Sequence, residues 1–308
     1  RVVGVRSTTY GDAWGESVIR STEGISGWDR GASCAVSSQP LAREGEQTQI
    51  GSGHDAGRDP AMLDLDRVAA EAADRATRLL GATKPPSGRL TIVLEPRLAM
   101  TLLGIIAGML SGEAVVKGRS PFADRVGERI AADVLTLVDD PTRAESLGSE
   151  EIDGEGLACR RNELIVGGVL DGFLRDTVTG RRMGMASTAS AVRGARSLPG
   201  VGAQLLIMSP GERSLEQIVS AVDHGLLVNS FTGLHSGVNP VSGDFSVGAD
   251  GLLIRDGQLA EPVRELTLAS TLQRMLLDVS EVGSDFEWLT SGHGACSLVI
   301  PDVAVSGA

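Results

Sequence analysis

Residues 233–270 alternate apolar with polar or small side chains in a pattern typical of antiparallel strands. Phe245 and Val247 alternate with Ser and Gly, and a second apolar run covers 252–254. Asp256 and Gly257 separate this run from an alternating segment over 263–268. Asp-Gly between two apolar runs is a good hairpin signal, because glycine accepts the positive φ that a tight turn demands. The pattern therefore predicts an antiparallel sheet here.

The N-terminal part predicts a small sheet followed by a helix. Short β-like runs at 14–20, 31–38 and 46–50 are separated by turns that contain Gly and Ser, so residues 1–53 are expected to form a β-meander. Asp64 or Asp66 then caps a helix whose apolar stripe reaches Leu80. The two prolines in 84–88 break helix and mark the best linker candidate.

Beyond the linker the expected elements are mixed. The pattern predicts a strand over 90–94, a helix over 98–110 that is apolar all round and buried, and a helix followed by a short strand over 122–138. Two strands are expected around Gly167 and Gly168 within 148–174, and a loop over the surface or a cleft is expected over 181–199. Ser214 with Gln217 fits a capping box that starts another helix.

These elements predict an α+β protein in two parts. Residues 1–84 form the remnant of a small N-terminal α/β domain, and residues 85–308 form a β-rich domain whose curved antiparallel sheets surround a few buried helices. Within the 98–110 helix and just after it, Gly104, Gly108 and Gly112 are spaced four apart, which favours tight core packing over contact with a ligand.

Composition excludes several classes of function. A net charge of -12 argues against nucleic-acid binding, which needs clustered Lys and Arg. The longest apolar run, 98–110, is too short to span a bilayer, so no membrane association is expected. The chain has 3 cysteines, and the odd number without a CxxC pair predicts reduced thiols and a cytoplasmic protein.

No catalytic constellation is visible in the residues themselves. There is no GxSxG elbow, and the glycines around Asp250 match no phosphate-binding loop. Among the 4 histidines, His54, His224, His235 and His293, only His293 has ligand-like spacing, as HxxC with Cys296. Zinc needs three or four ligands, and nothing nearby completes that set. We therefore expect no metal and no catalytic residue in this chain.

The segment 233–270, GLHSGVNPVSGDFSVGADGLLIRDGQLAEPVRELTLAS, closely resembles the C-terminal signature of PmbA (TldE) proteins in the TldD/PmbA, or modulator of gyrase, family. Further matches are 102–112, the IDGEG stretch at 152–156, the turn at 20–24 and the closing strand at 296–307. Family members usually carry a longer N-terminal portion, so residues 1–84 are expected to be the C-terminal part of an N-terminal domain.

The resemblance also locates a degenerate zinc motif. TldD proteins carry HExxxH on a helix, in which two histidines bind zinc and the glutamate acts as general base. The equivalent positions here are Gly104, Ile105 and Met109, and 98–112 contains no His, Asp, Glu or Cys. The resemblance therefore implies the PmbA/TldE branch, with zinc expected in a partner subunit rather than in this chain.

The function that the resemblance implies is that of a non-catalytic subunit in a heterodimeric metallopeptidase. A TldD-like partner would hydrolyse flexible peptides in a cavity that this chain helps to form. His235, Asn239 and Asp244 are the candidate contacts with the peptide substrate, although Asn and Asp in such loops more often stabilise turns. Two alternatives stay open: a self-sufficient homodimer that binds or tailors a small peptide-like metabolite without zinc, and a scaffold without a ligand.

Overall fold

The N-terminal part is a sheet backed by one helix. A computed structural model describes residues 1–194 and 196–307. Strands β1 (Val2–Arg20), β2 (Ser26–Glu44) and β3 (Gln47–Ile50) are hydrogen-bonded in that order, and β4 (Gly53–Gly57) pairs with another stretch of β2. After the 3-10 turn η1 (Pro60–Met62), helix α1 (Leu65–Thr77) begins where the Asp64 side chain accepts a hydrogen bond from the Arg67 backbone N–H. The predicted cap and helix are confirmed.

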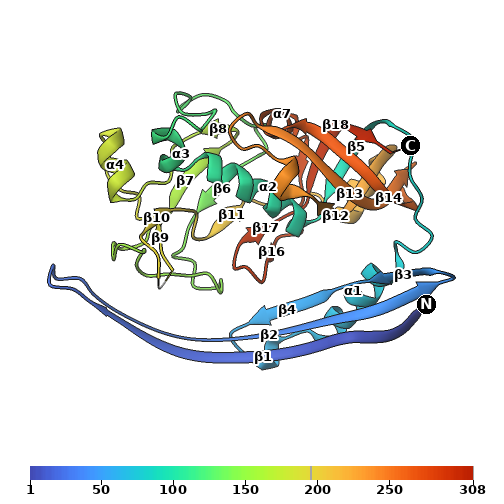
Figure 1. The fold of residues 1–308 in the computed structure, drawn as a ribbon, viewed down its shortest axis with the longest axis horizontal. Coiled ribbons are helices and arrows are strands. Elements are labelled where there is room, and N and C mark those ends of the chain that lie inside the picture. The colour runs from blue at the N-terminus through green and yellow to red at the C-terminus, as the bar shows by residue number, and fades with distance from the viewer. Residues whose placement is uncertain (195, 308) are drawn as a thin grey trace.

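The first two strands are much longer than the predicted meander. Each has 19 residues, and they pair along their whole length, so that they form a curved ribbon beneath the rest of the molecule (Figure 1). The expectation of short runs at 14–20 and 31–38 is wrong. Gly27, which lay between two of the predicted runs, is inside β2 and pairs with Ile19.

The second part is built around a closed sheet. Its strands are β5 (Gly88–Leu94), β12 (His224–Thr232), β13 (Asp244–Arg255), β14 (Gln258–Thr271), β15 (Glu281–Val282) and β18 (Leu298–Ser306). They are ordered β14-β13-β12-β5-β18-β15, and an additional pairing of β14 with β18 closes the sheet on itself. The predicted hairpin is confirmed, because β13 and β14 join at Asp256 and Gly257, which both have positive φ.

Alternate residues of this sheet face two different cores. Ile92 and Leu94 of β5 belong to the main core, together with α2 (Pro96–Met109), whereas Val93 between them packs against α5 (Leu215–Ser220). This is the period-2 alternation of a strand covered on both faces. Ser214 caps α5 through the predicted capping box with Gln217.

A second sheet extends the main core away from the closed sheet. Its order is β16 (Glu287–Trp288), β17 (Gly294–Ala295), β11 (Leu206–Met208), β6 (Leu137–Asp139), β7 (Asn162–Val166) and β8 (Val169–Leu170). The remaining elements are α3 (Gly112–Val116), α4 (Thr177–Met183), β9 (Ala191–Val192), β10 (Gly200–Val201), α6 (Leu234–Gly237) and α7 (Leu272–Asp278). The predicted strand pair around Gly167 and Gly168 is confirmed as β7 and β8.

The helix expected before β6 is absent from the described residues. Gly127 has a φ of 83°, and its backbone N–H bonds to the Leu170 carbonyl oxygen. The N–H groups of Ile130 and Ala131 both bond to the carbonyl of Gly168. The neighbouring hairpin therefore takes the backbone hydrogen bonds that a helix would have used.

In the described part of the chain, no helix combines the length and apolar character needed to cross a membrane. The α+β class, with β-rich curved sheets and few helices, is confirmed.

Candidate functional site

One face of α2 opens onto a cavity. The helix buries residues such as Leu98, Leu102 and Ile106, but Gly104 and Gly108 are exposed. A Cβ atom built on either glycine would meet no heavy atom within 4 Å. The predictions that the helix is buried all round and that these glycines serve tight packing are therefore wrong.

Tight packing does explain Gly112. The chain leaves the α2 axis after Met109, and Gly112 starts α3 instead of continuing the glycine face. A Cβ on Gly112 would lie 2.9 Å from the Leu174 carbonyl oxygen and 3.0 Å from Thr179 Oγ1. The three glycines that looked equivalent in the sequence thus serve two different purposes.

The cavity above the glycine face has a volume of about 480 Å³. Such a volume is within the usual range for ligand sites. Its lining comes from α2, from α3 and the residues after it, and from the loop before β13: Gly104, Ile105, Gly108, Met109, Ser111, Glu113, Ala114, Lys117, Arg119, Pro240 and Val241. Glu113 and Lys117 form an ion pair across one turn at this rim. The cavity is thus part apolar and part charged, with open space over the helix backbone.

The three positions that the resemblance aligned with the zinc motif all border this cavity. Gly104, Ile105 and Met109 supply no side-chain nitrogen, oxygen or thiolate that zinc would accept. Across the described residues, no group of three or more His, Cys, Asp or Glu is placed to hold a metal ion. The residues present therefore do not fit a catalytic zinc ion, and we derive no chemistry through one in this chain.

The predicted substrate contacts, His235, Asn239 and Asp244, lie on α6 and in the loop after it, which contributes Pro240 and Val241 to the cavity lining. The Asn239 side chain accepts hydrogen bonds from the backbone N–H groups of Val241 (2.9 Å) and Ser242 (3.4 Å). The Ser242 hydroxyl donates to Asp244 at 2.6 Å. These are the local bonds of a turn, as Asn and Asp commonly make. His235 is exposed on α6. A contact between these three residues and a peptide stays a prediction.

His293 and Cys296 are engaged in the fold. The Nδ1 atom of His293 accepts a hydrogen bond from the Leu206 backbone N–H at 3.1 Å, and burial lowers the pKa of this histidine. Cys296 is buried, and burial, followed by the charges of Asp285 and Glu287, raises the pKa of its thiol to about 12. A thiol with so high a pKa is neither a ready nucleophile nor a ready metal ligand at neutral pH.

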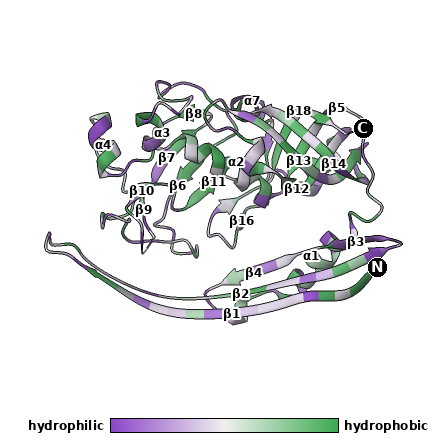
Figure 2. Ribbon diagram, in the orientation of Figure 1, coloured by the Kyte–Doolittle hydropathy of each residue, from purple (hydrophilic) through white to green (hydrophobic). Residues whose placement is uncertain are grey.

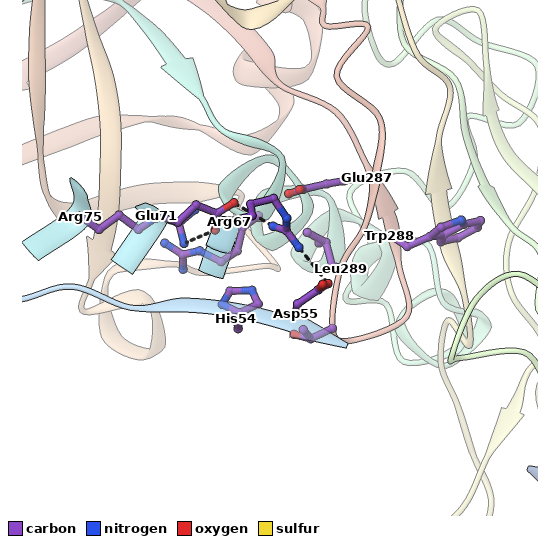
Figure 3. A pocket seen from close by; sticks show the side chains of 10 residues that line it. His54, Asp55, Arg67, Glu71, Arg75, Glu287, Trp288 and Leu289 are labelled. Carbon is purple, nitrogen blue, oxygen red and sulfur yellow. Dashed lines mark hydrogen bonds and ion pairs between the residues drawn. The ribbon is translucent and has the colours of Figure 1, made fainter. Parts of the chain in front are cut away.

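The sequence did not predict a second, charged cavity between the two parts of the molecule. Its volume is about 40 Å³, and Figure 3 shows its side chains: His54 and Asp55 from β4, Arg67, Glu71 and Arg75 from α1, and Glu287, Trp288 and Leu289 around β16. Arg67 pairs with Asp55 (2.8 Å) and with Glu71 (2.8 Å), and Arg75 pairs with Glu71 (3.6 Å).

The charged groups of this cavity come from segments far apart in the sequence. Arg97, at the start of α2, also lines it and donates to the Asn229 carbonyl oxygen at 3.2 Å. Burial, and next the charge of Arg75, lower the pKa of both His54 and Arg97, whereas burial and then Glu71 raise the pKa of Glu287. So small a volume suits ordered water rather than a substrate. We interpret this cluster as a joint between the two parts.

A neighbouring ion-pair network strengthens that joint. Arg78, just after α1, pairs with Glu95 at 3.1 Å and donates to the Asn229 side chain. The Asn229 amide in turn donates to Asp250 at 3.0 Å. Half-buried networks of this kind fix one geometry when every member is satisfied. The orientation of α1 relative to α2 and the closed sheet is therefore well determined.

Comparison with known proteins identifies the family. The family model described as the PmbA/TldA metallopeptidase C-terminal domain matches residues 87–307, and the model of the PmbA/TldA metallopeptidase central domain matches residues 1–80. The chain therefore belongs to the PmbA/TldD metallopeptidase family, as its resemblance indicated.

Individual relatives agree with this assignment. The chain is 27% identical to metalloprotease PmbA from Escherichia coli O157:H7 over 311 residues, which cover 100% of this chain and 66% of that protein. It is 29% identical to a metalloprotease from Methanothermobacter thermautotrophicus, over 76% of this chain and 50% of that protein. The chain thus spans between half and about two thirds of the length of these curated relatives.

Solved structures show the same fold. TldE from Thermococcus kodakarensis superposes with a TM-score of 0.89 and 26% identity, covering 97% of this chain and 69% of that one. A Thermotoga maritima protein named for a suggested role as a modulator of a DNA gyrase has a TM-score of 0.91 and 26% identity, covering 99% and 70%.

Proposed function

We propose that this member of the PmbA/TldD family is a non-catalytic, TldE-like subunit of a heterodimeric zinc metallopeptidase. The carrying observation is the face of α2. It opens onto a cavity large enough for part of a peptide, yet the motif positions on it are Gly104, Ile105 and Met109. A helix that borders an open cavity but carries no metal ligand can help to enclose a substrate while the partner subunit supplies the zinc.

The glycines of this wall favour main-chain recognition. Because Gly104 and Gly108 leave open space where a Cβ would be, a bound chain can lie close to the helix backbone. Ile105, Met109 and Val241 supply apolar contact, while Lys117 and Arg119 supply charge at the rim. Such a surface would hold flexible peptides with little regard to sequence, and hydrolysis would take place on the zinc-bearing, TldD-like partner. We include a cytoplasmic location in this proposal, because all three cysteines are free.

The experiment that tests this proposal is native mass spectrometry of the complex purified from its own host, read for mass and for zinc. A heteromer that contains zinc, with none retained by this chain alone, supports the proposal. Adding the partner should then restore cleavage of an unstructured peptide. Gly108→Leu should reduce that cleavage by about tenfold or more without unfolding the helix, because leucine has the higher helix propensity and fills the open space.

A zinc-free homodimer would instead support the alternative, in which the chain binds or tailors a small peptide-like metabolite by itself. Zinc bound by this chain alone would contradict both readings and would direct attention to His293 and Cys296.

A further inference from the structure

The charges that line the cavity on α2 are not balanced. Its charged lining residues are Glu113, Lys117 and Arg119, and the other residues of the lining are uncharged. Glu113 and Lys117 pair with each other, so one positive charge of the lining is left without a counterpart. The chain as a whole has a net charge of -12. An excess positive charge at a cavity of so acidic a protein favours an anionic group there.

This excess charge belongs to Arg119. The Arg119 side chain is exposed, and its guanidinium makes no ion pair and no hydrogen bond with any described residue. By contrast, Arg125 in the same segment pairs with Glu128 at 2.8 Å. A guanidinium that borders a cavity with its N–H donors unused can bind a carboxylate through two parallel hydrogen bonds.

The backbone holds Arg119 in a defined place. Helix α3 ends in a Schellman motif, in which the N–H groups of Gly118 and Arg119 bond to carbonyl oxygens of the helix at 3.0 and 2.8 Å. Gly118 has the positive φ of this motif, 63°. Beyond Arg119, the Ser120 hydroxyl accepts from the backbone N–H of the buried Phe122 at 3.2 Å. The backbone of Arg119 is therefore anchored on both sides.

Ser111 supplies a second donor to the same cavity. It is buried where α2 gives way to α3, and its hydroxyl accepts from the Ala114 backbone N–H at 3.2 Å. No described residue accepts the proton of this hydroxyl, so the proton is available to an oxygen of a ligand. Ser111 and Arg119 both follow α2 in the chain, and together they make the region after this helix the polar end of the cavity.

The rest of the lining suits a peptide main chain and apolar side chains. Gly104 and Gly108 leave the backbone of α2 open, and Ile105 and Met109 offer apolar surface. One guanidinium balances a single negative charge. A carboxylate carries one such charge, whereas a phosphate group carries about -1.5 to -2 at neutral pH. A ligand that combines an extended main chain with a carboxylate therefore matches both ends of the cavity.

We propose that this cavity selects peptides that present a carboxylate, and that Arg119 is the residue that binds this group. The inference rests on the peptide-holding role proposed above, and it names the chemical group on which the holding depends. The carboxylate belongs either to the C-terminus of the peptide or to an Asp or Glu side chain, since both offer the same two oxygens. The main chain is still held with little regard to sequence, and the carboxylate adds the selectivity.

Calorimetric titration of the intact chain, without the partner subunit, tests this selectivity. The probes are an acetylated pentapeptide of Ala and Leu with a free C-terminal carboxylate, the same peptide as its C-terminal amide, and that amide with one central Asp. The plain amide should bind about tenfold or more weakly than the better carboxylate peptide, because it lacks the charge-assisted hydrogen bonds. The carboxylate peptide that binds more tightly identifies the source of the group.

Substitution of Arg119 tests the residue itself. Arg119→Gln should reduce the affinity for both carboxylate peptides to that for the plain amide. Arg119→Lys should restore part of the affinity, because lysine keeps the charge but lacks the planar fork of donors. Arg43→Gln is the matched control, since it makes the same change in net charge at an exposed residue of β2 outside the cavity lining. This control should bind every probe as the wild-type chain does.

Three results would overturn the proposal. Equal affinity for the amide and the carboxylate peptides would show that the cavity holds peptides without this selectivity. Equal losses in Arg119→Gln and Arg43→Gln would show that overall charge, and no particular residue, attracts the carboxylate. Binding of none of the probes would also contradict it. Because these titrations use the chain alone, the mass spectrometry described above still decides separately whether the chain assembles with a zinc-bearing partner.

Discussion

The two long hairpins of this protein follow the same local rules but end in opposite environments. In the hairpin of β13 and β14, β13 alternates exposed or half-buried positions with buried ones and continues into a buried run. Strand β1 has no buried side chain among those described. Figure 2 shows the contrast between the apolar strands of the closed sheet and the mixed ribbon below. The pairing of β14 with β18 closes the sheet around a buried core, whereas β1 pairs only with β2 among the described strands.

The largest expected difference between the hairpins concerns their aromatic residues. Phe245 in β13 is 1% exposed and meets Phe231 edge to face at 5.9 Å, whereas Trp14 in β1 is 65% exposed. Phe245→Ala should lower the free energy of unfolding by about 3–5 kcal/mol, because it leaves a cavity in the core. Trp14→Ala should change it by less than about 0.5 kcal/mol. Urea unfolding of both variants measures this difference, and equal losses would contradict the contrast.

A pH-dependent difference of similar size is expected in the second sheet. Asp139 is fully buried. Its Oδ1 accepts from two backbone N–H groups, and Oδ2 has no hydrogen-bond partner among the described residues. Burial raises the pKa of Asp139 from 3.8 to about 6. The folded state therefore binds a proton on the Asp139 carboxyl more tightly than the unfolded state does. Protonated Asp139 stabilises the fold below pH 4, and this stabilisation is lost as the pH rises through about 6.

The variant Asp139→Asn isolates this effect. Relative to the variant, the wild-type chain should lose up to about 3 kcal/mol of unfolding free energy between pH 4 and pH 7, at about 1.4 kcal/mol per pKa unit. Thermal or urea unfolding of both proteins across this range measures the difference. A difference that is constant with pH, or that has the opposite slope, would contradict the assignment.

Glycines of the two hairpins should respond differently to a methyl group. A Cβ on Gly251 in β13 would lie 2.2 Å from the Leu227 carbonyl oxygen, while one on Gly15 in β1 meets nothing within 4 Å. Gly251→Ala should therefore cost about 1–3 kcal/mol through overpacking. Gly15→Ala should be neutral or slightly stabilising. Similar effects of the two changes on the denaturation midpoint would show that β1 is more crowded than the structure indicates.

The smallest expected effect is at the cap of α5, the helix that covers the outside of the closed sheet. Ser214→Ala removes a side chain that accepts from the Gln217 backbone N–H, and should cost about 1 kcal/mol. Ser7→Ala in β1 removes only an exposed bond to Gln39 and serves as the control, with no measurable change expected. Equal effects would mean that the cap contributes no more than a surface hydroxyl.

Local signals made much of the fold predictable. Asp64 before α1, Ser214 with Gln217 before α5, and the turn at Asp256 and Gly257 all appear where the pattern placed them. Each is satisfied by hydrogen bonds or dihedral angles within a few residues. The predicted helix before β6 failed for the converse reason, because its N–H groups bond to Gly168 and Leu170, about 40 residues further along the chain.

The candidate site was predictable only in part. The sequence showed that the helix now seen as α2 carries no metal ligand, since this depends on residue types alone. It did not show that Gly104 and Gly108 face open space, nor that His54, Arg97 and Glu287 meet around one charged cavity. The predicted contacts Asn239 and Asp244 lie in the loop that lines the cavity on α2, but their side-chain hydrogen bonds are those of a turn.

The amino-acid sequence by itself thus determined the caps, the tight turns, the residue types on α2 and the family. Only the tertiary structure decided which face of α2 is open, that the second part's sheet closes through β14 and β18, and that the described side chains of β1 are not buried. The physical reason is the range of the interactions. Caps and turns are satisfied by neighbours along the chain, whereas exposure and closure depend on which distant segments come to lie beside a residue.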